Sequence, residues 1–101
     1  MKTVIQDTKV CYLCGTTLNL EDHHCLNGSD RKKCEEDGLK VWLCANCHRI
    51  APYSAHRSIE TRIRLKRVAQ AKYLETHTQA EWFRRYYKNY FCLLYTSDAA
   101  D

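Results

Sequence analysis

Four of the seven cysteines form two Cys-x-x-Cys pairs, Cys11 with Cys14 and Cys44 with Cys47. A pair with this spacing presents two thiolates from one turn, and two pairs about thirty residues apart complete the tetrahedral ligand set that zinc prefers. A closed four-thiolate site leaves no position for a substrate, so we expect this zinc to be structural. Two redox-active pairs, or four buried free thiols, are the alternative interpretations of the same cysteines.

Histidines form a second group of potential ligands. His23 and His24 are adjacent, and His48 directly follows the second cysteine pair. An imidazole is a good general base near neutral pH, and it also binds divalent cations. Phosphodiester hydrolysis needs both functions, an activated water and a cation near the developing charge. Because adjacent strand residues point to opposite faces, we expect His23 and His24 to lie at a bend or at a strand end.

The length of 101 residues indicates one small domain. Such a domain buries too little apolar surface for a large core, so a metal, a disulfide or a partner is expected to stabilise it. The first seven residues lack the apolar segment of a signal peptide, and no apolar run is long enough to span a membrane. We therefore expect a cytoplasmic protein with reduced cysteines and no membrane partner.

The last ten residues, 92–101, resemble the translation of a sequencing adapter read through into an open reading frame. We expect a non-native tail after Phe91 and leave it out of the fold prediction. Without Asp98 and Asp101, the net charge of the chain rises above its formal value of +4. A basic balance makes a polyanion such as nucleic acid the natural partner, although a solvated basic surface has the same composition.

The elements that must position these groups follow the pattern of a loose β-hairpin followed by helices. Two β-favouring segments flank a polar turn at residues 27–30 and a basic-then-acidic segment that is either an exposed loop or a short helical turn. Pro52 ends a first short helix near Ala51, because the residue before a proline avoids helical geometry. Thr78 and Glu81 form a capping box that starts the last helix. The expected elements are strands over residues 20–26 and 39–43, and helices over residues 44–51, over residues 54–75 and from residue 78.

Three further expectations concern packing. Residues 1–10 are polar, so we expect a loosely held lead-in. Cys25 is expected to be buried, and Cys34 is expected to be an exposed loop thiol. An aromatic stripe in the last helix is expected to pack rather than to stack on bases, because a small domain needs that area. The stripe consists of Trp82, Phe83, Tyr86, Tyr87 and Tyr90.

Three motifs together resemble those of the HNH endonucleases, the ββα-metal nucleases, and small phage-encoded members are the most similar. The motifs are Cys11-x-x-Cys14, Leu20-Glu21-Asp22-His23-His24 and Leu43-Cys44-x-x-Cys47-His48. The resemblance covers residues 11–56. It implies a small α+β protein with one domain over residues 1–91, in which a zinc-stapled ββα-metal core is followed by two C-terminal helices over residues 54–91.

The resemblance implies a role for each histidine. His23 matches a metal-ligand position, and His24 matches the general base that takes a proton from the attacking water. His48 matches a metal ligand on the following helix, and His56 matches a further ligand found in several members. The implied catalytic cation is magnesium, manganese or zinc, and an imidazole-rich site favours a transition metal. The implied activity is metal-dependent hydrolysis of DNA by a phage or prophage protein in the host cytoplasm, with other phage proteins as further partners.

One position departs from the family pattern. The middle asparagine of the family falls near Gly38 or Leu39, and neither residue can orient a base. Asn27 and Asn46 are the alternatives, and their spacing does not choose between them.

The basic residues fall into two groups. Arg31, Lys32 and Lys33 lie between the expected strands, beside the expected site, and are the predicted nucleic-acid-binding group. A second group lines the long helix and is expected to be mainly solvated. It consists of Arg62, Arg64, Lys66, Arg67 and Lys72.

Two other functions fit the same sequence. One is a non-catalytic zinc-binding module that binds DNA or a protein of phage recombination or packaging. The other is a redox protein that uses one Cys-x-x-Cys pair, which would require a βαβ pattern that the sequence lacks.

Overall fold

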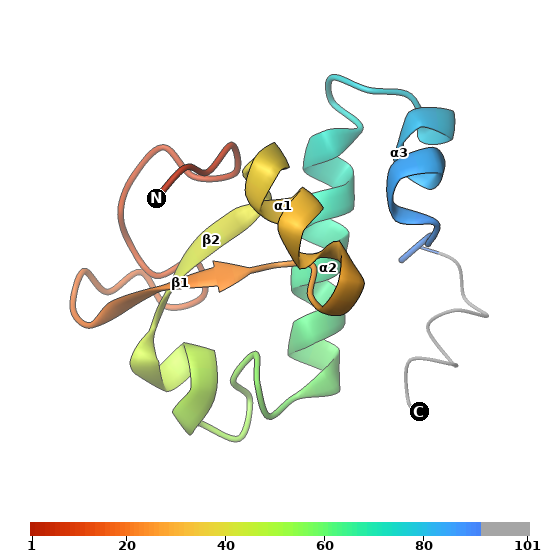
Figure 1. Cartoon of the computed structure of the whole chain (residues 1–101). Coiled ribbons are helices and arrows are strands. Elements are labelled where there is room, and N and C mark those ends of the chain that lie inside the picture. The colour runs from red at the N-terminus through yellow and green to blue at the C-terminus, as the bar shows by residue number, and fades with distance from the viewer. Residues whose placement is uncertain (92–101) are drawn as a thin grey trace.

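Two antiparallel strands joined through a short helix form the sheet of this protein (Figure 1). The computed structural model describes residues 1–91, so the expected non-native tail lies outside the described residues. The expected small α+β class is confirmed. The elements, in chain order, are β1 (Leu20–His24), the 3₁₀ helix η1 (Gly28–Asp30), α1 (Arg31–Asp37), β2 (Lys40–Cys44), the single π-helical turn η2 (Asn46–Ile50), α2 (Ile59–Tyr73) and α3 (Gln79–Tyr86).

The hairpin register places the chemical groups at defined points. Leu20 pairs with Cys44 at one end of the ladder, and His24 pairs with Lys40 at the other. Val41 and Leu43 of β2 are fully buried, as expected for β-favouring apolar residues on the inner side of a sheet. The hairpin therefore carries a cysteine at one end and a histidine at the other.

The segment between the strands contains a helix, α1. The sequence pattern had allowed two alternatives for it, an exposed loop or a short helical turn. α1 ends at Gly38, whose φ of 68° closes the helix in the left-handed conformation that glycine adopts without strain. Cys34 is completely buried, and its thiol donates to the Leu39 carbonyl at 3.0 Å. The expectation of an exposed Cys34 is wrong, because the helix turns this position towards the core. Cys25 is buried, as expected.

Residues 1–10 are not a loose lead-in, and that expectation is also wrong. The Val4 amide donates to the Gly38 carbonyl at 2.9 Å, and the Trp42 amide donates to the Gln6 side chain at 2.7 Å. The hydroxyl of Thr3 donates to the Lys40 carbonyl. Polar side chains thus fix this segment along the edge of β2 that does not pair with β1.

The long helix begins later than predicted. Its expected start was residue 54, but residues 51–58 form turns, and α2 starts at Ile59. The amides of Ala55 and His56 donate to the carbonyls of Cys47 and His48, each at 2.9 Å, which bends the chain back over η2. The hydroxyl of Ser58 then caps the helix by accepting from the Thr61 amide at 3.2 Å.

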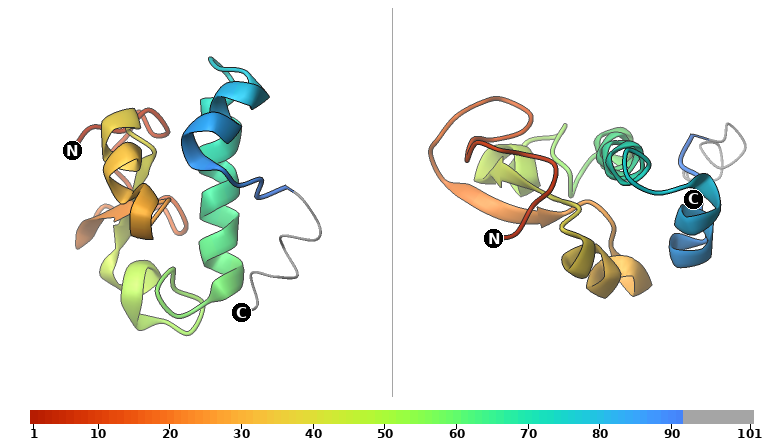
Figure 2. Two further views of the ribbon diagram at one scale, coloured as in Figure 1. Left: turned by 45° about the vertical axis from the view of Figure 1, so that its right-hand side comes forward. Right: turned by 90° about the horizontal axis from the view of Figure 1, so that it is seen from above.

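The views in Figures 1 and 2 place α2 between the hairpin and α3. The capping box of Thr78 and Glu81 is present, as predicted. The aromatic stripe is only partly packed: Trp82, Tyr86 and Tyr90 are buried, whereas Phe83 and Tyr87 are exposed. No helix within residues 1–91 is long and apolar enough to cross a membrane.

Candidate functional site

The four cysteines of the two pairs converge, as predicted. Cys11 and Cys14 come from the turn after the N-terminal segment, Cys44 ends β2 and Cys47 lies in η2. Their sulfur atoms lie within 4.8 Å of one another. The Cys14 and Cys44 sulfurs are 3.7 Å apart, and a tetrahedral site with zinc–sulfur bonds of about 2.3 Å has sulfur–sulfur edges of about 3.8 Å. The cluster could therefore hold a metal ion.

Backbone amides favour negative charge in this cluster. The Cys47 amide donates to the Cys44 sulfur at 3.4 Å. Burial alone raises the pKa of the Cys11 thiol, but amides of Cys44, Cys14 and Leu13 outweigh it and bring this pKa to about 6. Burial, followed by the neighbouring thiols, raises the pKa of Cys47 instead. Cys11 thus forms a thiolate readily, and a bound cation would offset the burial that disfavours the thiolate of Cys47.

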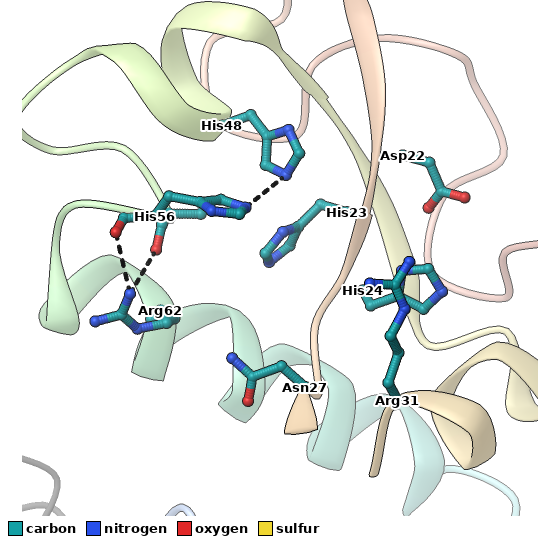
Figure 3. A pocket seen from close by; sticks show the side chains of 9 residues that line it. Asp22, His23, His24, Asn27, Arg31, His48, His56 and Arg62 are labelled. Carbon is teal, nitrogen blue, oxygen red and sulfur yellow. Dashed lines mark hydrogen bonds between the residues drawn. The ribbon is translucent and has the colours of Figure 1, made fainter. Parts of the chain in front are cut away.

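Three histidines form a second cluster, supplied by separate segments (Figure 3). His23 comes from β1, His48 from η2 and His56 from the turn that the η2 carbonyls hold in place. The Nε2 atoms of His48 and His56 are 3.1 Å apart. Two imidazoles on a tetrahedral zinc have nitrogen atoms about 3.3 Å apart. Suitable nitrogen atoms of all three rings lie within 4.8 Å of one another, which fits a shared cation.

His23 has an unusual environment. Its side chain is buried, and within residues 1–91 its Nε2 atom has no hydrogen-bond partner. Burial, together with the nearby His48 and His56, lowers the pKa of His23 to about 3. Burial and His48 also lower the pKa of His56. A buried nitrogen without a partner is costly, and a cation at this point would satisfy it.

Glu21 and Arg49 support the histidine cluster, and sequence reasoning missed both. Nδ1 of His48 lies 2.8 Å from Oε1 of Glu21, and Arg49 donates to both oxygens of that carboxylate at 3.1 and 2.9 Å. Arg49, followed by His48, lowers the pKa of Glu21 to about 2. A carboxylate that accepts from the far nitrogen of an imidazole fixes the tautomer and the orientation of a ligand. The available signal was the strand period of two, because Glu21 and His23 share one face of β1.

His24 lies at the end of β1, as expected, but its ring does not join the three other histidines. Its Nε2 atom lies 2.7 Å from Oε1 of Glu35. His24 and Arg31 also line a second hollow, whereas Figure 3 shows His23 facing His48 and His56. His24 nevertheless lines the same cavity, which has a volume of about 260 Å³. The cavity is lined by Asp22, His23, His24, Asn27, Arg31, His48, Ala55, His56 and Arg62.

The structure distinguishes the two asparagines that the sequence left open. Asn27 lines the cavity, and Figure 3 shows its side chain below His23. Asn46 lies elsewhere, with its amide donating to the Tyr53 hydroxyl at 3.1 Å. Asn27 is therefore the asparagine beside the histidines.

The predicted nucleic-acid-binding group is divided. Arg31 lines the cavity, and Lys32 lines a neighbouring hollow together with His24 and Arg31. Lys33 faces α3 instead, where its Nζ donates to the Arg85 carbonyl at 2.8 Å and lies 5.3 Å from the centre of the Tyr87 ring. The structure therefore brings two of these three residues to the candidate site.

Within the second basic group, Arg62 reaches the cavity, and its guanidinium also donates to the His56 carbonyl at 3.2 Å. Arg67 donates to the Tyr90 carbonyl at 2.7 Å, and Lys72 pairs with Glu75 at 3.1 Å. Arg62 is thus the residue of this group that lies beside the histidines.

No protein-family model, curated protein or solved structure matches the chain. The geometry of the two clusters is therefore the basis for a functional proposal.

Proposed function

We propose that this protein is a metal-dependent DNA endonuclease of the HNH type. The observation that carries the proposal is the unpartnered Nε2 of His23, which faces His48 and His56 in a cavity that His24 also lines. Three imidazoles from separate segments suit a transition metal better than magnesium. Their position beside arginines favours a phosphodiester as the substrate.

In this proposal, each group has a distinct task. His23, His48 and His56 would hold a divalent cation, which when bound supplies positive charge to the phosphate oxygens. Arg31 and Arg62 lie on either side of the cavity and would contact the phosphates. The four cysteines would hold a structural zinc, because thiolates suit its borderline-soft character.

The hydrolysis would use His24 as the general base. A ring nitrogen of His24 takes one proton from a water molecule, and the resulting hydroxide oxygen forms a bond to phosphorus. The bond between phosphorus and the leaving oxygen breaks, and that oxygen takes a proton from solvent. The imidazolium then returns its proton to solvent, so one water is consumed for each bond cleaved.

A plasmid-nicking assay with added manganese, zinc or magnesium tests the proposal. Wild type is expected to convert supercoiled plasmid to the nicked form, and His24→Ala is expected to do so about 100- to 10,000-fold more slowly, the usual contribution of a general base. His77→Ala is a matched control, because His77 stacks on Tyr73 away from the cavity, and it should cleave normally. Cleavage by the His24→Ala protein at the wild-type rate, or no cleavage by wild type, would reject the nuclease proposal.

A non-catalytic zinc-binding module for DNA or for a phage protein is the second candidate. It is favoured by the bond between His24 and Glu35, which engages the candidate base outside the histidine cluster. This candidate predicts metal binding and DNA binding with no cleavage under any metal. The redox alternative has less support, because the described strands are antiparallel and form no βαβ unit.

A further inference from the structure

The candidate base His24 is held by a carboxylate from a different element. Oε1 of Glu35, in α1, lies 2.7 Å from Nε2 of His24 (side-chain exposure 13%). A carboxylate only accepts, so Nε2 carries the hydrogen in this bond. Within residues 1–91, no group is hydrogen-bonded to Nδ1 of His24. The bond to Glu35 thus leaves the lone pair on Nδ1.

Glu35 is itself fixed by Lys40, the strand partner of His24. Nζ of Lys40 donates to both oxygens of Glu35, at 2.9 and 2.8 Å, and to Oδ2 of Asp22 at 3.2 Å. The Lys40 side chain is only 2% exposed, and a buried ammonium requires such partners. Asp22, His24 and Glu35 are close enough to hold a metal ion, but the Lys40 ammonium already lies between the two carboxylates, bonds to both and offsets one of their two negative charges. The group is therefore better suited to holding His24 than to binding a second cation.

The helix that carries Glu35 is anchored at its C-terminal end, directly after Glu35. Arg85 of α3 donates to Asp37 at 2.7 Å and to Glu36 at 3.0 Å, and the hydroxyl of Tyr86 also donates to Asp37. The buried Cys34 holds the middle of the helix. Glu35 therefore projects from a fixed backbone, as a residue that orients another side chain must.

We propose that Glu35 is a positioning residue, which fixes the orientation and the tautomer of His24 so that Nδ1 takes the proton from water. This inference rests on the proposed function of His24 as the general base. The Glu35 carboxylate would also stabilise the imidazolium that forms when His24 is protonated. Glu35 makes no contact with the reacting atoms in this proposal, and it acts only through the histidine.

Steady-state nicking kinetics test the proposal. Glu35→Ala is expected to lower kcat by about 10- to 100-fold, the usual effect of losing a residue that orients a catalytic imidazole. KM should stay unchanged or fall, because a negative charge near DNA is removed. Glu35→Gln should retain an intermediate kcat, because its amide oxygen can still accept from Nε2. Glu75→Gln is the matched control with unchanged kcat, because Glu75 pairs with Lys72 and is part of neither the cavity nor the anchor of α1.

A double variant separates positioning from a general structural effect. In a His24→Ala background, Glu35→Ala should cause no further loss, because the residue through which Glu35 acts is gone. An additional loss in that background would overturn the proposal. An unchanged kcat for Glu35→Ala in the wild-type background would overturn it as well.

The tautomer of His24 gives a readout that does not depend on cleavage. Long-range ¹H–¹⁵N spectra of the imidazole in the full chain should show Nε2–H in wild type and in Glu75→Gln, and a mixture of tautomers in Glu35→Ala. A pure Nε2–H signal in Glu35→Ala would refute the positioning role. If wild type shows no cleavage that depends on His24 but the tautomer shift occurs, the nuclease proposal fails and the contact between Glu35 and His24 stands.

Discussion

His48 and Glu21 are joined by a 2.8 Å contact between Nδ1 of the imidazole and Oε1 of the carboxylate. The contact links η2 to β1, so it holds together the two segments that supply His48 and His23. It also directs Nε2 of His48 towards His56, at 3.1 Å. The histidine cluster is thus organised by a carboxylate outside the three imidazoles.

Replacing Glu21 should therefore weaken metal binding by the histidines. Glu21→Gln is expected to lower the affinity for manganese by about 10- to 100-fold, because His48 loses the carboxylate that fixes its tautomer. Calorimetric titration of protein whose cysteine cluster is already loaded with zinc measures this change. Glu60→Gln, in the first turn of α2, is the control and should bind as wild type does. Equal affinities for Glu21→Gln and wild type would contradict the supporting role of Glu21.

Loss of one thiolate should remove the structural metal. Cys44→Ser is expected to contain about one zinc ion per chain fewer than wild type and to have a lower melting temperature, because metal binding and folding are coupled in small domains. Elemental analysis and circular dichroism measure the two effects. Cys25→Ala removes a buried thiol outside the cluster and should keep its zinc even if it melts earlier. Full zinc content in Cys44→Ser would rule out the four-cysteine site.

Arg31 should contribute to DNA binding through its charge. Arg31→Gln is expected to weaken binding and to reduce the slope of log affinity against log salt by about one, as the loss of one phosphate contact does. Fluorescence anisotropy over a range of salt concentrations gives that slope. Arg84→Gln, on α3 and away from the cavity, is the comparison and should leave the slope unchanged. The same slope for wild type and Arg31→Gln would exclude Arg31 from the interface.

Tyr86, which anchors α1, should contribute to the free energy of unfolding. Tyr86 is buried and donates to the Asp37 carboxylate. Tyr86→Phe should therefore lower the free energy of unfolding by about 1.5 to 3 kcal/mol, the range for hydrogen bonds to charged groups. Urea denaturation measures the loss. Tyr87→Phe is a neighbouring control with a side chain exposed to solvent, and it should unfold as wild type does. A neutral Tyr86→Phe would mean that this bond does not stabilise α1.

The parts of the site that were predictable from the sequence are those set by local spacing. A Cys-x-x-Cys turn places its two sulfur atoms close together through local backbone geometry alone. The convergence of Cys11 and Cys14 with Cys44 and Cys47 could then be predicted, because one tetrahedral metal site needs both turns. His48 could be placed for a related reason, since it directly follows one of these turns. The proline and the capping box likewise marked helix boundaries through local backbone chemistry.

The parts that were missed depend on contacts between distant segments. Glu35 belongs to a basic-then-acidic run that has no periodicity, and its partner His24 lies eleven residues away across the hairpin. The later start of α2 results from amides of residues 55 and 56 bonding back to η2, which no helix propensity describes. The burial of Cys34 was missed because this residue was expected in a loop, whereas it lies in α1.

The N-terminal segment along β2 has a consequence for the protein in concentrated solution. A two-stranded sheet has two open edges, and an open edge is a template for a strand from another molecule. Thr3, Val4 and Gln6 occupy the backbone groups around residues 38–42 on one of these edges. A chain that lacked those residues would expose this edge and would be expected to self-associate. The N-terminal segment, which supplies no proposed ligand or catalytic group, therefore protects the hairpin against aggregation.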